Sequence, residues 1–475
     1  MTSWNSRAFD ELMAIRACPD TLDDEISVRG ADPFYRSPLR MGEAITAVVA
    51  ATGVAINDIW ALRGHPRQKI AVSLPEAAAS LRTVIYTQSR NEDGTCSTVP
   101  LPPDRAHVMQ LCRPYRTRDG RWFTPHFSLD LGAKVLKVLG CDDTVESVSE
   151  AVARWDAEDL EEAIAQAGAC GGVVRTRDEW LAHPHGAYLA SRAAVQLTRV
   201  GESEPEAFYP GDRPLSGVRV LDLTRIVAGP IVSRGLVEHG ADVLMVTSQD
   251  LLQAPEHLRD TSPGKRSCFL DLKTPQGVAE LTRLVQEADV VVNSFRPGAL
   301  DALGFGTKDL VRMRPGIVVV NVSCYGYDGP FAKRRGWEQI AQTVTGLSDA
   351  HGMALEGSPQ IITPLVCDFT TGCLGTYGAL LALGRRAREG GSWQVEVSLC
   401  RSAMFVQEQG LLAEFDDAPE ELTTEQLSRR QVPMHSDEHG DLMMLGPVLE
   451  LSQTPSDWGQ SLPRLGEHDP VWLAR

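Results

Sequence analysis

From Gly217 onward, short runs of apolar, strand-forming residues alternate with segments whose apolar residues recur at helical spacing. The runs are VRVLDL (218–223), DVLMV (242–246), CFLDL (268–272), DVVVN (289–293), IVVVNVS (317–323) and QVEVSL (394–399). Most of them are apolar throughout, which is typical of a parallel sheet with helices on both faces. We therefore predict a doubly wound, Rossmann-like α/β large domain over residues 217–405.

The residues before this domain predict a smaller α+β domain over 96–200. PYRTRDGRWFTPH (114–126) has the pattern of two short strands around an Asp119-Gly120 turn, and helices are expected between residues 131 and 167. Residues 201–216 are rich in Pro, Gly and acidic residues, so we interpret them as a linker. Residues 406–475 are expected to form a C-terminal arm.

Residues 1–95 contain a weak internal repeat of part of the large domain. Pro38-Leu39 precedes a helix-patterned stretch and the run IAVSL, as Pro364-Leu365 precedes a helix-patterned stretch and QVEVSL. Pro38 to Val72 spans 34 positions and Pro364 to Val397 spans 33, so we predict that one helix–strand unit occurs twice. Chance remains the alternative because the shared residues are few.

The composition restricts the class of protein. The formal net charge of −17 disfavours nucleic acid as a partner. No run approaches 18 apolar residues and the N-terminal stretch lacks a signal-type apolar core, so we expect a cytoplasmic protein without a membrane segment. The ten cysteines form no CxxC pair or zinc-type cluster, and we expect neither metal nor disulfide.

Five ordered segments resemble the class III (CaiB/BaiF-type) CoA-transferases, the family of formyl-CoA transferase, carnitine CoA-transferase and methylacyl-CoA racemase. The segments are GVRVLDLTRIVAGP (217–230), GKRSCFLDL (264–272), ADVVVNSFRPGALDALGFG (288–306), SCYGYDGPFAKRRGWEQIAQTVTG (323–346) and CDFTTGCLGTYGALLAL (367–383). The resemblance implies a CoA-transferase that acts on an acyl-CoA and a carboxylic acid, without metal.

The order of the parts differs from that family, in which the nucleotide-fold half comes first and the small domain second. Here a small-domain-like unit precedes the nucleotide-fold half. Together with the weak internal repeat, this order suggests a rearranged fusion of two partial copies of a family member. Because family members form interlocked dimers, the chain is expected to be either a homodimer or an internal pseudo-dimer.

Asp368 lies after a Pro-containing loop, where a helix is predicted to start. Such a residue can simply cap the helix by accepting hydrogen bonds from its first amides. The resemblance implies a second role, as the nucleophile that forms an aspartyl mixed anhydride and then an aspartyl-CoA thioester. Both roles are compatible, because the amino end of a helix also stabilises a carboxylate.

Three glycines, Gly372, Gly375 and Gly378, recur at three-residue spacing behind Asp368. Inside a helix, each Gly lowers the stability of the helix by roughly 1 kcal/mol relative to Ala. We expect a compensating close approach, either of another backbone or ligand, or of a sheet packed tightly against the helix.

Basic residues near predicted strand ends are candidates for the CoA phosphates, since ligands of open α/β sheets bind there. The resemblance assigns the CoA groove to Lys265, Arg266, Phe295, Arg296 and Arg335, with Phe295 near the adenine. It places Gly326 in the loop near the pantetheine end. Trp337 is expected to form an apolar wall against the acyl or pantetheine chain.

Some positions depart from the family. Val227 stands where the transferases often carry Gln, Thr247-Ser248 replaces an acidic and basic pair, and Ala302 replaces an Arg. A catalytically lapsed CoA-binding protein is therefore an alternative. A 2-methylacyl-CoA racemase or epimerase is another, but it needs a second base, and the position of the family's His is Trp337. An NAD-dependent dehydrogenase is disfavoured because no GxGxxG follows the first strand.

Overall fold

The computed structural model describes residues 4, 6–18, 25–91 and 93–475. Its centre is a seven-stranded sheet in the spatial order β11-β10-β9-β12-β13-β14-β8. The first six strands are parallel, and β8 is antiparallel to β14 at one edge. The strands are β8 (Gln196–Gly201), β9 (Arg219–Asp222), β10 (Asp242–Thr247), β11 (Arg266–Phe269), β12 (Val290–Asn293), β13 (Val318–Ser323) and β14 (Ser392–Ser398). The strand order reverses between β9 and β12, as in Rossmann-type sheets, which confirms the predicted fold class.

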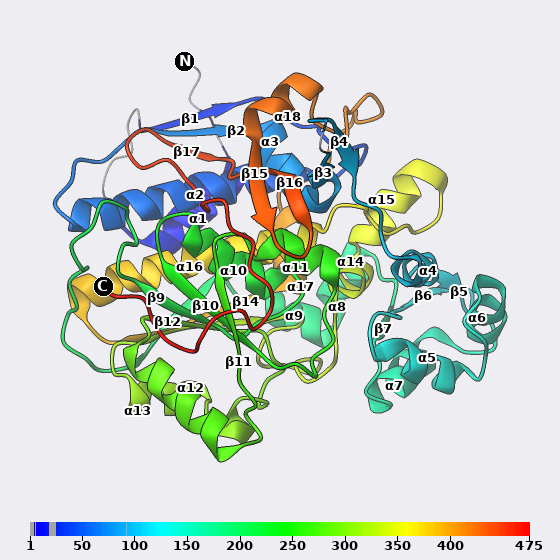
Figure 1. The fold of residues 1–475 in the computed structure, drawn as a ribbon. Coiled ribbons are helices and arrows are strands. Elements are labelled where there is room, and N and C mark those ends of the chain that lie inside the picture. The colour runs from blue at the N-terminus through cyan, green and yellow to red at the C-terminus, as the bar shows by residue number, and fades with distance from the viewer. Residues whose placement is uncertain (1–3, 5, 19–24, 92) are drawn as a thin grey trace.

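Helices cover both faces of this sheet, as its continuously apolar strands require (Figure 1). One face carries α10 (Ala228–Val237) and α16 (Val366–Glu389), and α14 (Glu338–Thr345) and α17 (Leu399–Gln407) pack against α16. The other carries α12 (Pro275–Glu287) and α13 (Thr307–Met313). Short helices α11 (Pro255–Thr261) and α15 (Leu347–Glu356) and the 3-10 turn η2 (Asp301–Leu303) lie in the connections.

The small domain has its own apolar core and lies to one side of the large sheet (Figure 1). The predicted hairpin is confirmed, because β5 (Tyr115–Arg116) pairs with β6 (Trp122–Pro125) and Gly120 between them has φ +81°. The domain also contains β7 (Gly171–Val173), α5 (Leu131–Leu139), α6 (Val145–Val152) and α7 (Ala157–Gln166). Strand β8 falls mostly within the range 96–200 proposed for this domain, yet it joins the large sheet.

Contacts between the small domain and α14 hold the carboxyl-terminal half of that helix. Thr343 Oγ1 on α14 donates to Thr124 Oγ1 on β6 at 3.0 Å, and the Arg175 amide donates to the Thr343 carbonyl at 3.2 Å. The segments that frame the small domain are α4 (Pro103–Leu111), α8 (Arg177–Ala182) and α9 (Pro184–Ala190).

The N-terminal unit repeats the helix–strand pattern of the large domain. Helix α2 (Met41–Leu62) leads to β2 (Ile70–Ser73), as α16 leads to β14, and in each case a helix starts at the next residue, Leu74 or Leu399. Figure 1 shows α2 lying along α16. The unit also contains α1 (Arg7–Arg16), β1 (Ile26–Arg29), α3 (Leu74–Ala79), η1 (Ser80–Tyr86), β3 (Gln88–Arg90) and β4 (Cys96–Thr98).

The C-terminal residues add strands to the N-terminal unit. Strand β17 (Leu449–Leu451) pairs with β2 in a three-stranded sheet with β1, and β16 (Gly440–Leu445) pairs with β3 in a sheet with β4 and β15 (Gln431–Ser436). Helix α18 (Thr424–Arg430) precedes them. The first and last parts of the chain therefore form shared sheets.

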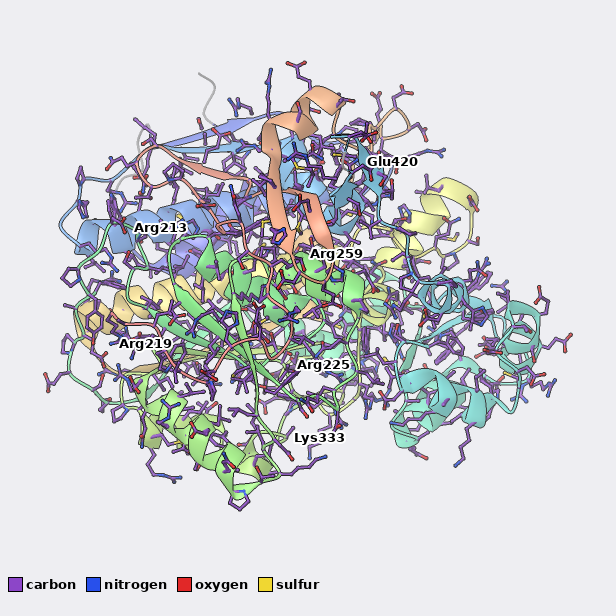
Figure 2. All side chains as sticks on the ribbon, viewed as in Figure 1. Arg213, Arg219, Arg225, Arg259, Lys333 and Glu420 are labelled. Atoms are coloured by element: carbon purple, nitrogen blue, oxygen red, sulfur yellow. The ribbon has the colours of Figure 1, made fainter. Side chains whose placement is uncertain are left out.

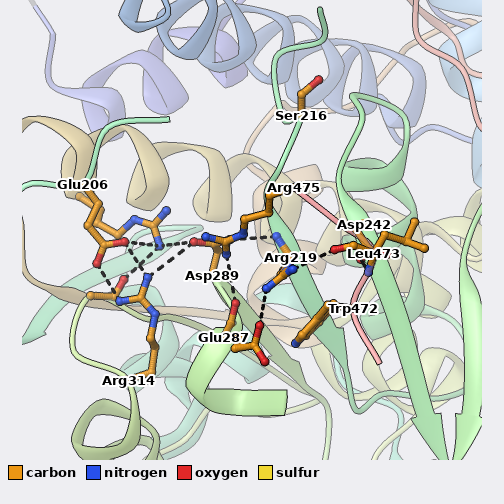
Figure 3. Close-up of polar contacts among 12 residues, drawn as sticks. Glu206, Ser216, Arg219, Asp242, Glu287, Asp289, Arg314, Trp472, Leu473 and Arg475 are labelled. Atoms are coloured by element: carbon orange, nitrogen blue, oxygen red, sulfur yellow. Dashed lines mark hydrogen bonds and ion pairs between the residues drawn. The ribbon is translucent and has the colours of Figure 1, made fainter. Parts of the chain in front are cut away.

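Ion pairs connect separate segments of the chain at the amino-terminal edge of the large sheet (Figure 3). Asp289 accepts from Arg386 Nη1 at 3.0 Å and from Arg475 Nη2 at 2.8 Å. Arg314 and Glu206 form a neighbouring ion pair at 2.6 Å. Each of these arginines is paired with a carboxylate, which contrasts with the arginines at the opposite edge described below.

Two helices, α2 and α16, are long and apolar enough to cross a membrane by length and composition. However, 78% of the α2 window and 94% of the α16 window are buried inside the protein. Both are core helices of this fold, as their mutual packing shows.

The glycines of α16 allow the close approach that their spacing predicts. A Cβ on Gly372 would lie 2.5 Å from Ile231 Cβ and 2.8 Å from the Ala228 carbonyl oxygen on α10. A Cβ on Gly378 would lie 2.4 Å from Val395 on β14. Both expected causes are therefore present, a helix backbone at Gly372 and the sheet at Gly378.

We predict that Gly372→Ala lowers the free energy of unfolding by about 1–3 kcal/mol, because the new methyl group overpacks the α10–α16 contact. Gly384→Ala is the matched control on the same helix, since its Cβ would meet only Arg388 Nη1 at 3.5 Å. It should be neutral or stabilise by up to about 1 kcal/mol. Chemical denaturation of both variants measures the difference, and equal effects would contradict this packing.

Candidate active site

A cleft of about 1110 Å³ opens at the carboxyl ends of the parallel strands. It lies where the strand order reverses, the usual ligand site of an open α/β sheet. Loops after β9, β12, β13 and β14 and the start of α16 supply its walls. The lining residues are Arg225, Ile226, Val227, Ala228, Gly229, Ser294, Phe295, Arg296, Ala299, Val322, Ser323, Cys324, Arg335, Gly336, Trp337, Asp368 and Leu399.

The loop between β9 and α10 is strained and firmly held. Ile226 has φ +78°, a conformation that costs a β-branched residue of order 1–3 kcal/mol. Just before it, Asp222 Oδ2 accepts from Lys265 Nζ at 3.0 Å, and Lys265 Nζ also donates to the Pro230 carbonyl at 2.8 Å. This buried ion pair fixes both ends of the strained loop against the cleft.

Asp368 occupies the first turn of α16 but does not cap it. The capping residue is Glu338 on α14: Glu338 Oε2 accepts from the Asp368 amide at 2.6 Å, and Oε1 accepts from the Cys367 amide at 3.0 Å. Gln342 Nε2 donates to Glu338 Oε1 at 2.8 Å. Because Glu338 satisfies these amides, the carboxyl group of Asp368 is left to line the cleft, where the residue is 9% exposed.

The pKa of Asp368 is raised well above its usual range. Burial is the largest cause and the negative charge of Glu338 is the second, while hydrogen bonding to the Ala228 backbone acts in the opposite direction. Burial also raises the pKa of Glu338, although its amide donors favour the charged form. Since Glu338 has three hydrogen-bond donors, we infer that it ionises first and that Asp368 ionises as the pH rises through its own raised pKa.

The opposite part of the cleft is cationic. Arg225, Arg296 and Arg335 come from three separate loops. Burial lowers the pKa of Arg225 and Arg296, and the Arg335 charge acts in the same direction on both, while the charge of Asp130 opposes the shift at Arg225. Within the described residues, none of the three forms an ion pair with a carboxylate, and Arg335 Nε has no hydrogen-bond partner. Three guanidinium groups that repel one another in a cleft favour a bound anion.

Arg225, which Figure 2 labels, was not singled out from the sequence. It follows β9 at the reversal point, and its Nη1 donates to the Leu252 carbonyl at 2.9 Å. An arginine two residues after the end of a predicted strand, VRVLDL (218–223), is the signal that could have identified it. Glu338 was likewise not predicted, because its role depends on α14 and α16 meeting in space.

Trp337 lines the cleft, and a residue of the small domain packs against its ring. The His126 ring lies 4.6 Å from the Trp337 ring, centroid to centroid, and burial lowers the pKa of His126 to about 3. His126 is therefore neutral at pH 7 and is not itself a lining residue.

The structure brings five of the candidate residues to the cleft: Asp368, Phe295, Arg296, Arg335 and Trp337. Lys265 is buried against Asp222, as described above. Arg266 pairs with Asp242 at 2.9 Å, and these are the first residues of β11 and β10, so the pair lies at the opposite edge of the sheet. Gly326, with φ +84°, faces Leu189 and Tyr188 of α9.

The N-terminal unit has a parallel arrangement at the start of α2. Glu43 is the third residue of α2, as Asp368 is the third of α16, and the Glu43 amide donates to Asp32 Oδ2 at 2.8 Å. Asp32 thus takes the capping role that Glu338 has in the large domain. Glu43 is therefore the structural counterpart of Asp368, and it pairs with Arg40 at 2.9 Å.

The cleft therefore combines one carboxyl group with three cationic side chains. Its lining contains no histidine and no second acidic residue. Among the described residues, no group of three or more His, Cys, Asp and Glu side chains is placed to hold a metal ion. Such a cleft can bind an anionic molecule and offer it one nucleophilic carboxylate, whereas it lacks the two bases that proton exchange at a carbon atom requires.

Comparison with known proteins gives consistent matches. Residues 215–430 match the family model CoA-transferase family III. Acetyl-coenzyme A transferase nodX of Hypoxylon pulicicidum is 35% identical over 310 residues, which are 60% of this chain and 52% of that protein. An acyl-CoA transferase of Gibberella moniliformis is 30% identical over 412 residues, 79% of this chain and 72% of that protein.

Solved structures give partial matches. A CAIB/BAIF family protein from Brucella suis is 30% identical and covers 42% of this chain and 56% of its own, with a TM-score of 0.39. The chain thus spans about half the length of that protein and of the Hypoxylon relative.

Proposed function

The chain belongs to CoA-transferase family III, and we propose that it moves CoA between an acyl-CoA thioester and a carboxylic acid through covalent intermediates on Asp368. The observation that carries this proposal is the position of Asp368. Its carboxyl group is the one acidic side chain that lines a cleft whose other charged groups are arginines. Both curated relatives described above carry names of CoA or acyl-CoA transferases, which supports the same activity.

In the first half of the reaction, an ionised Asp368 oxygen attacks the thioester carbonyl carbon and the carbon–sulfur bond breaks. The products are a mixed anhydride and CoA thiolate. The thiolate then attacks the aspartyl carbonyl carbon, which releases the first acid as its carboxylate and leaves an aspartyl-CoA thioester.

In the second half, an acceptor carboxylate attacks this thioester and expels the CoA thiolate again, forming a second mixed anhydride. The thiolate attacks the acceptor's carbonyl carbon, and the product acyl-CoA leaves with Asp368 restored as a carboxylate. No redox change occurs, and over the whole cycle one thioester is exchanged for another of similar energy. Burial of Asp368 assists the attack, because it removes water that would solvate the nucleophile and hydrolyse the anhydride.

The three arginines suit the phosphate groups of CoA. Guanidinium groups bind phosphate oxygens through charge-assisted hydrogen bonds, and all three reach the cleft without a carboxylate partner among the described residues. Phe295, which also lines the cleft, offers an apolar face to the adenine. Lys265 and Arg266 are not needed for this binding, since each already has a carboxylate partner.

The racemase alternative has less support, because the lining offers one carboxyl group and Trp337 in place of a second base. The alternative of a lapsed CoA-binding protein predicts the same cleft without turnover, and the substitution of Asp368 distinguishes it. For the architecture, we propose that residues 1–95 and the large domain form an internal pseudo-dimer, since α2 packs along α16 in one chain.

We predict that Asp368→Asn lowers the rate of CoA exchange between an acyl-CoA and a labelled carboxylic acid by at least about 10³-fold, as expected when a covalent nucleophile is lost. The fold should be retained, because Glu338 and not Asp368 caps α16. Isotope exchange followed by chromatography measures the rate. Exchange at the wild-type rate would refute the nucleophile, and no exchange by the wild-type protein would favour the CoA-binding alternative.

We predict that Arg335→Gln raises the KM for acyl-CoA by about 10-fold or more, because it removes charge-assisted hydrogen bonds to phosphate. The turnover number should change less. Lys333→Gln is the matched control, since Lys333 is an exposed cation two residues away that does not line the cleft (Figure 2). Steady-state kinetics test both variants, and equal increases in KM would show that only the net charge matters.

We predict that Glu338→Gln shifts the acid limb of the pH–rate profile to lower pH. The Glu338 charge raises the pKa of Asp368, so its removal lowers that pKa and leaves Asp368 ionised at more acidic pH. The pH dependence of kcat/KM measures the shift in the free enzyme. Thermal unfolding provides the control for the lost helix cap, and an acid limb that stays in place or moves to higher pH contradicts the coupling.

A further inference from the structure

Two cysteine thiols lie next to each other at the carboxyl edge of the large sheet. Cys324 directly follows β13 and Cys400 is the second residue of α17, and their Sγ atoms are 4.0 Å apart. Cys400 is fully buried, whereas Cys324 is 9% exposed and lines the cleft that holds Asp368. Among the described residues, Cys324 is the only cysteine in this lining. A small molecule that enters the cleft therefore reaches one thiol of the pair directly.

The backbones of the two cysteines are held at a distance that a disulfide can span. The Cys400 amide donates to the Cys324 carbonyl at 2.9 Å. With the bond lengths on either side of this hydrogen bond, the two Cα atoms lie within roughly 7 Å of each other, the upper limit for a disulfide. The Sγ atoms then have to approach by about 2 Å to reach the S–S bond length of ~2.05 Å. Rotation of the two side chains can supply this movement without a break in the pairing of β13 with β14.

The Cys324 side chain is also packed against the segment that leads to Trp337 and Glu338. A Cβ on Gly336 would lie 2.5 Å from Cys324 Cβ and closer still to its Sγ, so the two residues are in contact. Gly336 directly precedes Trp337, which lines the cleft, and Glu338, which caps α16. A movement of Cys324 Sγ toward Cys400 therefore alters a contact that supports both the cleft wall and the start of α16.

We propose that Cys324 and Cys400 form a reversible disulfide when a hydroperoxide enters the cleft, and that this bond stops CoA transfer at Asp368. Formation of the bond depends on the two thiols alone. Its effect on CoA transfer rests on the proposed function as well.

The bond forms in two steps when hydrogen peroxide is the oxidant. The Cys324 sulfur attacks one peroxide oxygen and the O–O bond breaks, which gives Cys324 sulfenic acid and water. The Cys400 sulfur then attacks the sulfenic sulfur, forms the S–S bond and releases a second water molecule. The two thiols lose two electrons and two protons, and the peroxide is reduced to water. Dithiothreitol restores both thiols by exchange with the disulfide.

The surroundings of Cys324 make its thiol slow to react at neutral pH. Burial is the largest cause of its raised pKa, and Cys400, Asp368 and Glu338 act in the same direction. Because the thiolate is the reactive form, the rate of oxidation should increase as the pH rises. Oxidation is therefore best measured in alkaline buffer.

The test is oxidation of the full chain with hydrogen peroxide at about pH 8.5, with and without acyl-CoA. The remaining thiols are alkylated, and mass spectrometry of the digest should show the peptides of Cys324 and Cys400 joined. Acyl-CoA should slow this joining, because it fills the cleft through which the oxidant enters. CoA transfer by the oxidised protein should fall at least about 10-fold, since displacements of about 1 Å near reacting groups have effects of this size or larger. Dithiothreitol should restore the transfer rate.

Variants of the buried cysteine isolate the bond from other oxidation. Cys400→Ser and Cys400→Ala remove the second thiol, so Cys324 should stop at the sulfenic acid, which dimedone labels. Cys96→Ser is the matched control, because Cys96 is an exposed cysteine on β4 and does not line the cleft. It should form the Cys324–Cys400 bond and lose activity as the wild-type protein does.

Each outcome decides one part of the proposal. If Cys324 and Cys400 stay reduced while Cys96 in the same sample is oxidised, or if Cys324 joins another cysteine, the modification site is wrong. A Cys324–Cys400 bond that leaves the transfer rate unchanged overturns its effect on the site. A reduced wild-type protein without CoA transfer overturns the proposed function and that effect, whereas the peptide map still decides whether the bond forms.

Discussion

The contact on which the site depends is the one between the Glu338 carboxylate and the first amides of α16. The amino end of a helix must satisfy its free N–H groups, and here a residue of another helix does so at 2.6 and 3.0 Å. Asp368 is thereby relieved of capping and can direct its carboxyl group to the cleft. The same contact places a negative charge beside Asp368, which adds to the larger effect of burial in raising the pKa of that residue. Asp32 repeats the device at α2, which shows that the helix start is built in the same way twice.

Much of the fold could be predicted because it follows from local patterns. Continuously apolar strands required a parallel sheet with helices on both faces, and the β5–β6 hairpin followed from Asp119-Gly120. The pairing of distant segments could not be predicted. Strand β8 lies in the stretch interpreted as the small domain but adds to the large sheet, and β17 reaches back to β2 across most of the chain. Nothing in the composition of a short strand specifies its partner.

In the candidate site, too, residues marked by a local pattern could be predicted, whereas contacts between distant segments could not. Asp368, Phe295, Arg296 and Arg335 follow strand ends or start a helix, and the sheet brings such positions to one edge. Lys265 and Arg266 lie at the amino end of a strand instead, and their side chains pair with Asp222 and Asp242. Glu338 could not be recognised, because one acidic residue before an apolar helix has many ordinary roles. The arginines without ion-pair partners were equally hidden, since pairing is a property of the folded chain.

The central claim is that an Asp368 oxygen becomes covalently bound to the acyl group during turnover. In the most direct measurement, the protein catalyses the exchange between an acyl-CoA and an acceptor acid that carries ¹⁸O in its carboxylate. The mass of the proteolytic peptide that contains Asp368 is then determined by mass spectrometry. The proposed sequence delivers one acceptor oxygen to Asp368, so this peptide should gain one ¹⁸O atom. Complete turnover without any ¹⁸O in Asp368 would contradict the account.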